Sequence, residues 1–147
     1  MISDLYPSFY MSNLLKSETY KNLKNETEFL KLSDTIPQSH YLYITSQLNK
    51  ASYFLLNNKK EQGVSIINKL IEQFPRYAHL YIKLAHFYQD SKDFESAIKN
   101  YEKALELTKN ENLHATIYFD LAQIYDIEKN TIKAHENLEK SLKLKNK

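Results

Sequence analysis

The sequence contains no cysteine, a single glycine and only three prolines. Without cysteine the chain cannot form disulfides, bind a metal through thiolates or attack a substrate with a thiol, and it suits a reducing compartment. Gly63 alone cannot build the glycine-rich loops whose backbone amides bind phosphates, which excludes the usual nucleotide-binding motifs. So few turn-forming residues also disfavour tight hairpins between strands. These absences favour an all-helical protein.

Long apolar runs are missing as well. No stretch approaches the roughly 20 apolar residues that a membrane-spanning helix needs. The first residues lack the basic and apolar regions of a secretory signal. We therefore expect one domain of 147 residues, without membrane insertion, in the cytoplasm or an organelle stroma.

Arginine is almost absent: all but one of the 20 basic residues are lysines. The lysines alternate with acidic residues and the net charge is only +2, as is typical of solvated helix faces. Proteins that bind nucleic acids cluster their basic residues and favour arginine for phosphates and bases. The sequence therefore disfavours nucleic acid as a partner.

What is present is helical periodicity. From Tyr41 onward, apolar residues recur every three or four positions, which predicts amphipathic helices. Pro75 ends the second of them, and Asp93 and Asn130 are placed to cap two later ones. The first predicted helix runs from about Tyr41 to just before Asn57. The other predicted helices cover about 61–73, 77–89, 94–108, 113–127 and 131–144.

The helices occur in pairs that repeat with a period of about 34 residues. Registers beginning at Ile44, Ala78 and Ala115 bring apolar, aromatic and small residues into step. Small residues recur midway along the first helix of each pair and early in the second, which lets two helices approach closely. These small residues are Ala51, Ala85 and Ala122, followed by Gly63, Ala97 and Ala134.

A paired-helix repeat of this length resembles the tetratricopeptide repeat family. The resemblance covers about residues 44–147 and implies an all-α solenoid of three helix-turn-helix hairpins in a right-handed superhelix, preceded by an N-terminal helical segment. The implied repeats are 44–77, 78–114 and 115–147.

Residues 1–43 do not repeat convincingly. On the same template Asn25 falls where a small residue belongs, and Lys16 where an aromatic residue belongs. Apolar spacing nevertheless predicts one helix near 17–31. We favour a cap over the end of the solenoid, the alternative being a mobile arm that docks only with a partner.

No constellation of residues predicts catalysis, a cofactor or a metal. His79 and His86 lie about 10 Å apart along one helix, too far to share one metal ion. Acidic pairs such as Asp90 and Asp93 are better explained as helix caps or solvated faces. No GxSxG string marks a nucleophilic serine. We therefore predict that the chain is not an enzyme.

The family resemblance implies a partner-binding groove, because the first helix of each hairpin lines the concave face. A row of Leu48, Ile82 and Phe119, framed by His86 and Gln123, suits an apolar or amphipathic segment of another protein. The subtype that grips the carboxylate of chaperone tails is disfavoured, since its lysine and asparagine are replaced here by Leu48 and Ser52. The groove residues are Thr45, Leu48, Ser52, Leu55, His79, Ile82, His86, Gln89, Thr116, Phe119, Gln123 and Asp126.

Binding to another protein therefore leads the functional hypotheses. An adaptor or dedicated chaperone is the first, because three repeats after an N-terminal helical region resemble bacterial secretion chaperones of the tetratricopeptide type. The second half is also similar to tetratricopeptide photosystem I assembly factors of cyanobacteria and low-GC plastids, although those usually carry a membrane anchor.

A self-associating structural scaffold is the other alternative. An apolar strip with Ile132, Leu138 and Leu142 on the last hairpin suggests weak homodimerisation through that end.

Overall fold

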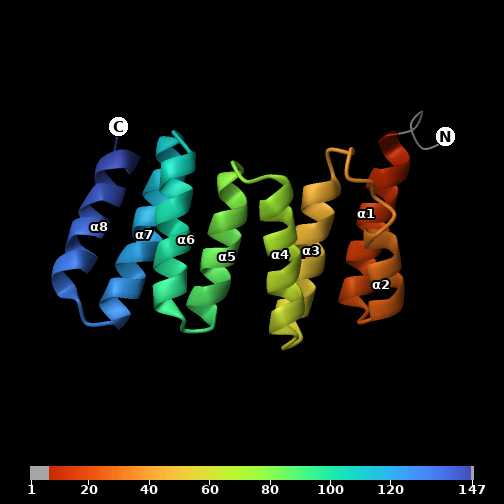
Figure 1. The fold of residues 1–147 in the computed structure, drawn as a ribbon, viewed down its shortest axis with the longest axis horizontal. Coiled ribbons are helices and arrows are strands. Elements are labelled where there is room, and N and C mark those ends of the chain that lie inside the picture. The colour runs from red at the N-terminus through yellow and green to blue at the C-terminus, as the bar shows by residue number, and fades with distance from the viewer. Residues whose placement is uncertain (1–6, 147) are drawn as a thin grey trace. The chain divides into compact units, whose positions relative to one another are not determined.

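The computed structural model describes residues 7–146, and every regular element within that range is an α-helix (Figure 1). The predicted all-α fold is confirmed. None of these helices combines the length and the hydrophobicity that a membrane crossing requires. The helices are α1 (Pro7–Asn22), α2 (Glu26–Ser33), α3 (Tyr43–Leu56), α4 (Lys60–Gln73), α5 (Ala78–Asp90), α6 (Phe94–Leu107), α7 (Glu111–Ile127) and α8 (Thr131–Lys145).

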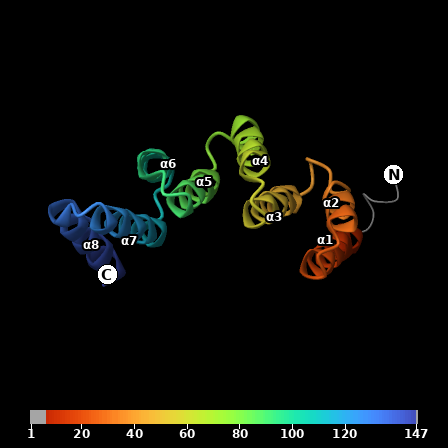
Figure 2. The same ribbon diagram turned by 90° about the horizontal axis from the view of Figure 1, so that it is seen from below.

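The chain divides within α4 into two compact units. The first ends at Leu70 and the second begins at Ile71. In both units the helices pair as antiparallel hairpins, seen nearly end-on in Figure 2. The hairpins of the first unit are α1–α2 and α3–α4, and those of the second are α5–α6 and α7–α8.

Each hairpin turns through one residue with left-handed backbone geometry. The four φ angles lie at 58°, 59°, 60° and 59°. Successive turn residues are separated by one repeat period, so the turn follows the repeat seen in the sequence. Left-handed geometry reverses the chain at once, since it ends one helix and frees the next to begin two residues later. The residues are Lys24, Asn58, Lys92 and Lys129.

Side-chain caps follow these turns. Asp93 Oδ1 accepts a hydrogen bond from the backbone N–H of Ser96 at 3.2 Å, and Asn130 Oδ1 accepts one from Lys133 at 3.2 Å. Both predicted caps are confirmed. Asn25 caps α2 in the same way.

The N-terminal segment is a hairpin, and the prediction of one helix near 17–31 is wrong. Because the left-handed Lys24 corresponds to Asn58 of the next hairpin, the sequence template is out of register by about one helical turn. In the structural register Ser17 takes the small-residue position of Ala51. Ser17 is fully buried and its hydroxyl donates to the carbonyl of Leu14 at 2.7 Å. A serine whose hydroxyl bonds within its own helix can be buried like alanine, which hides the repeat in the sequence.

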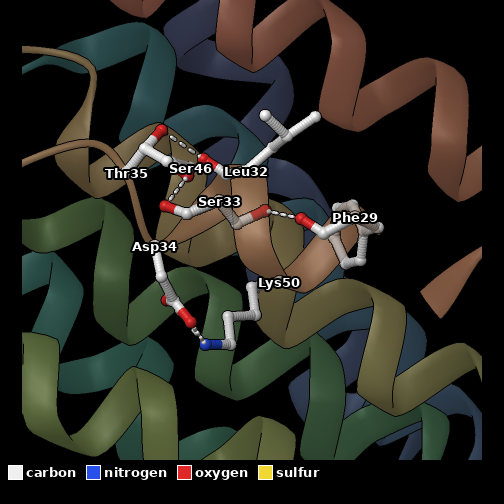
Figure 3. A network of polar contacts seen from close by, with 7 residues as sticks. All are labelled: Phe29, Leu32, Ser33, Asp34, Thr35, Ser46 and Lys50. Atoms are coloured by element: carbon white, nitrogen blue, oxygen red, sulfur yellow. Dashed lines mark hydrogen bonds and ion pairs between the residues drawn. The ribbon is translucent and has the colours of Figure 1, made fainter. Parts of the chain in front are cut away.

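Polar contacts join the end of α2 to α3 (Figure 3). Ser46 Oγ donates to the backbone carbonyl of Ser33 at 3.0 Å, where the end of α2 leaves carbonyls without a helical partner. One turn further along α3, Lys50 Nζ lies 2.7 Å from Asp34 Oδ1. These contacts fix how α3 packs on the first hairpin.

An aromatic contact and a second ion pair extend this junction. The rings of Phe29 and Tyr53 lie 4.8 Å apart, and Phe29 is completely buried. Lys59 Nζ lies 2.6 Å from Glu26 Oε1, and its hydrogen bond lowers the pKa of the Glu26 carboxyl. The first unit is therefore held by a mixture of aromatic and polar contacts.

The only glycine lies where α4 crosses α3. A Cβ atom on Gly63 would lie 2.5 Å from Leu55 Cδ2 and 3.0 Å from the carbonyl oxygen of Ala51. A hydrogen is therefore the only substituent that fits without displacing Leu55.

In the second unit α7 packs on the α5–α6 hairpin (Figures 1 and 2). Its inner face, Ile117, Leu121 and Ile124, is buried in one core cluster with Ala85 and Ala97, which occupy predicted small-residue positions. Small residues allow the close approach, and the aliphatic side chains fill the remaining space. The cluster also contains Ala78, Ile82, Tyr101 and Ala104.

Replacing Lys92 with glycine is expected to stabilise the second unit slightly. A residue with a side chain loses about 1–2 kcal/mol in left-handed geometry, whereas glycine gives up about 0.5–1 kcal/mol of unfolded-state entropy. We expect a net gain of up to about 1 kcal/mol in the free energy of unfolding, measured by urea denaturation. The control Lys99→Gly, on the exposed side of α6, should lose about 1 kcal/mol. Equal losses in both variants would contradict strain at Lys92.

Candidate functional site

The predicted groove residues divide between the two units. Four lie on α3 in the first unit, where Thr45 and Ser52 are exposed and Leu48 is half-buried. Leu55 is also half-buried, against Gly63 of α4. The other eight lie on α5 and α7 of the second unit. There the structure shows which of them come together.

A polar contact crosses from α5 to α7. His86 Nε2 lies 3.1 Å from Asp120 Oδ2, and the two side chains are 42% and 14% exposed. The ring of His86 also meets that of Tyr101 edge-on, with centroids 5.7 Å apart. Tyr101 donates its hydroxyl to Gln89 Oε1 at 2.7 Å. Two predicted groove residues, His86 and Gln89, are thus held in place by side chains from α6 and α7.

Burial raises the pKa of the Tyr101 hydroxyl, and the carboxylates of Asp120 and Asp90 raise it further. The phenol therefore stays protonated and remains a hydrogen-bond donor throughout the pH range in which proteins ordinarily stay folded. Such a group can position Gln89, but it is a poor nucleophile. Within residues 7–146, no three His, Asp or Glu side chains are grouped so that they could hold a metal ion.

The repeat position that His86 occupies on α5 also makes a contact between helices in the first unit, where Glu18 of α1 occupies it. Asn49 Nδ2 of α3 donates to Glu18 Oε2 of α1 at 3.5 Å. In the repeat register, Glu18 corresponds to Ser52 of the second hairpin, His86 of the third and Gln123 of the fourth. Each hairpin therefore carries one polar residue at this position of its first helix.

Three predicted groove residues of α7 line an open concavity that α7 forms with α8. Its volume is about 420 Å³. Phe119 and Leu138 expose apolar surface there, at 40% and 38% of each residue. Lys145 lies near its edge, with Nζ 5.3 Å from the centre of the Phe119 ring. The lining residues are Phe119, Ala122, Gln123 and Asp126 from α7, and Thr131, Ala134, His135 and Leu138 from α8.

Ile82 is not part of this open surface. It is 6% exposed and packs in the core that α5 and α6 form with α7. Phe119 occupies the equivalent position in the next hairpin, where none of the described helices covers it. The row of three accessible anchors is therefore reduced, in this unit, to Phe119.

Two further predicted residues, His79 and Thr116, lie outside the concavity. His79 is exposed and stacks on the ring of Tyr77, with centroids 5.3 Å apart. Thr116 is exposed and donates its hydroxyl to the carbonyl of Asn112 at 3.1 Å. Neither contributes to the cluster around His86.

The sequence profile of the tetratricopeptide repeat family matches residues 76–147. These residues are tetratricopeptide repeats. The resemblance inferred from the sequence is confirmed for this part of the chain, which holds the α5–α7 contacts and the concavity. In general, tetratricopeptide repeats are non-catalytic modules that bind other proteins.

Solved structures support the tetratricopeptide fold over nearly all of the chain. The crystal structure of MamA is similar at a TM-score of 0.70 and 16% identity, covering 99% of this chain and 83% of that one. A double mutant described as MamA RS-1 ArsTM gives 0.68 and 14%, covering 98% and 79%. At these identities the likeness shows the fold alone. No curated protein matches this chain.

Some residues of the concavity lie on α8, the second helix of its hairpin. The sequence prediction missed them because it took groove residues only from the first helix of each hairpin. His135 and Leu138 occupy the positions in α8 that Ile98 and Tyr101 occupy in α6. Both α6 residues belong to or border the core that receives α7. Asp120 has no such signal, because its role depends on His86 of the neighbouring hairpin.

Proposed function

We propose that this chain is a non-enzymatic adaptor or dedicated chaperone that binds an apolar or amphipathic segment of another protein. The observation that carries this proposal is the concavity between α7 and α8. It exposes Phe119 and Leu138, and Gln123, Asp126 and His135 line it beside them. Apolar anchors between a few polar groups are typical of sites that bind a polypeptide segment in one register.

The polar groups of the neighbouring α5 are held before any partner arrives. Asp120 contacts His86, and Tyr101 donates to Gln89, so neither side chain must be ordered on binding. Immobilising a free side chain costs about 0.5–1.5 kcal/mol, and a fixed one avoids that cost. This arrangement suits recognition, because His86 and Gln89 are already fixed in place by contacts with Asp120 and Tyr101.

Site-specific cross-linking tests the proposal. A photo-reactive amino acid at Gln123 should give a discrete adduct with another protein in cells, identified by mass spectrometry. The matched control places the same amino acid at Lys129, which is exposed in the turn before α8. Equal adducts from both positions would contradict a binding site in the concavity.

Binding of the identified partner should then depend on Phe119. We expect Phe119→Ala to weaken binding by about tenfold or more, because buried aromatic anchors dominate interface energies. Isothermal titration calorimetry measures the loss, and Lys129→Ala is the control. Unchanged affinity of Phe119→Ala would show that the partner binds elsewhere.

A further inference from the structure

The concavity between α7 and α8 has the geometry to bind another helix. In the second unit α7 buries its inner face on α5 and α6. The core residues of α5 and α6 correspond, in the next hairpin, to residues of α7 and α8 that line the open concavity. The pairs are Ile82 and Phe119, Ala85 and Ala122, Ala97 and Ala134, and Tyr101 and Leu138. The first helix of a further hairpin would therefore fit the concavity as α7 fits α5 and α6.

Helix α1 carries, on its exposed side, two residue types with which α3 docks on α2. In the first unit α3 docks on α2 through Ser46 and Lys50 (Figure 3). The same residue types stand one repeat period earlier on α1, as Ser12 and Lys16. Both are exposed, and within the described residues neither has a hydrogen bond or an ion pair. Thus α1 shares the serine and the lysine of the α3 docking face, and no described residue contacts either side chain through a hydrogen bond or an ion pair.

The charge that would receive Lys16 is present on α8. Lys50 pairs with Asp34, and the residue three repeat periods after Asp34 is Glu139. Glu139 is exposed on α8 and has no ion pair among the described residues. Lys16 and Glu139 are therefore a complementary pair in the register that Lys50 and Asp34 define.

An apolar contact follows from the same register. Leu15 of α1 is 62% exposed and corresponds to Asn49 of α3, which contacts Glu18 of the preceding hairpin. The position of Glu18 corresponds to Gln123 at the concavity. Leu15 would therefore lie over the concavity, whose apolar surface comes from Phe119 and Leu138.

We propose that α1 of a second copy of this chain docks in the concavity, with its Lys16 against Glu139 and its Leu15 over Phe119. The inference rests on the part of the proposed function that makes the concavity a binding site for a polypeptide segment; here that segment comes from a second copy in place of a foreign protein. The contact joins two different surfaces, so each bound copy leaves one of each surface free. Such heterologous association can continue beyond a dimer.

Sedimentation velocity over a range of micromolar concentrations tests this. We expect the weight-average mass to rise with concentration past that of a dimer. Lys16→Glu or Glu139→Lys should each raise the dissociation constant about fivefold, the scale of an exposed ion pair turned into repulsion. The double variant should restore association. Leu15→Ser should raise the dissociation constant about tenfold, because a leucine side chain is no longer buried.

Lys99→Glu is the control, since it changes the net charge as Lys16→Glu does but lies on the exposed side of α6. A protein that stays monomeric at every concentration overturns this proposal and leaves the proposed function intact. Self-association whose dissociation constant is unchanged by either charge reversal also overturns it. Cross-linking from Gln123 that yields only adducts of the chain with itself supports self-docking and overturns the foreign partner.

Discussion

Replacing Ile82 with aspartate is expected to unfold the second unit, although the sequence pattern marks Ile82 as a binding residue. Its side chain packs in the core with Ala85, Tyr101 and Ile117. A carboxylate there would lose its hydration, and the surrounding cluster offers it no cation. We expect the free energy of unfolding to fall by about 4 kcal/mol or more, a large fraction of the stability of a small domain.

Urea denaturation followed by circular dichroism measures this effect. Lys83→Asp is the matched control, because Lys83 is the next residue of α5 and is exposed. The control should change the free energy of unfolding by no more than about 0.5 kcal/mol. If Ile82→Asp were as stable as the control, Ile82 would belong to the open face after all.

Removing the Tyr101 side chain is expected to cost almost as much. Tyr101 is completely buried in the cluster, and its ring meets that of His86. Tyr101→Ala should lower the free energy of unfolding by about 3–5 kcal/mol, because it removes a large buried ring and leaves a cavity. It also leaves Gln89 without its donor.

Tyr101→Phe is the matched control for the hydroxyl, since it keeps the ring and removes only the hydrogen bond to Gln89. We expect a loss of about 1 kcal/mol, the usual net contribution of one hydrogen bond. The same denaturation experiment compares both variants. Similar losses for the two would show that the hydrogen bond, and not ring packing, makes the contribution of Tyr101.

The N-terminal hairpin shows where sequence reasoning reaches its limit. Its turn at Lys24 has the same geometry as those at Asn58, Lys92 and Lys129. Yet Ser17 replaces the alanine expected at the small position, and α2 ends early, at Ser33. A pattern of residue types cannot reveal a repeat whose members keep only the backbone geometry and the size of one buried side chain.

The candidate site shows a different limit. Ile82 and Phe119 occupy the same position of successive hairpins, so the sequence assigns them the same role. One is buried and the other is 40% exposed, because α7 packs over α5 and α6 and no described helix packs over α7 and α8 in the same way. Exposure is a property of the neighbouring hairpin, which the repeat register does not contain.

Local interactions account for what could be predicted from the sequence. The helix positions from Tyr43 onward, the caps at Asp93 and Asn130 and the small residues at Ala85 and Ala97 follow from the spacing of nearby residues, and the structure confirms them. The contact of His86 with Asp120 joins two different hairpins, and the openness of the concavity depends on what packs over α7 and α8. They depend on how whole helices pack, which needs three-dimensional coordinates to be seen.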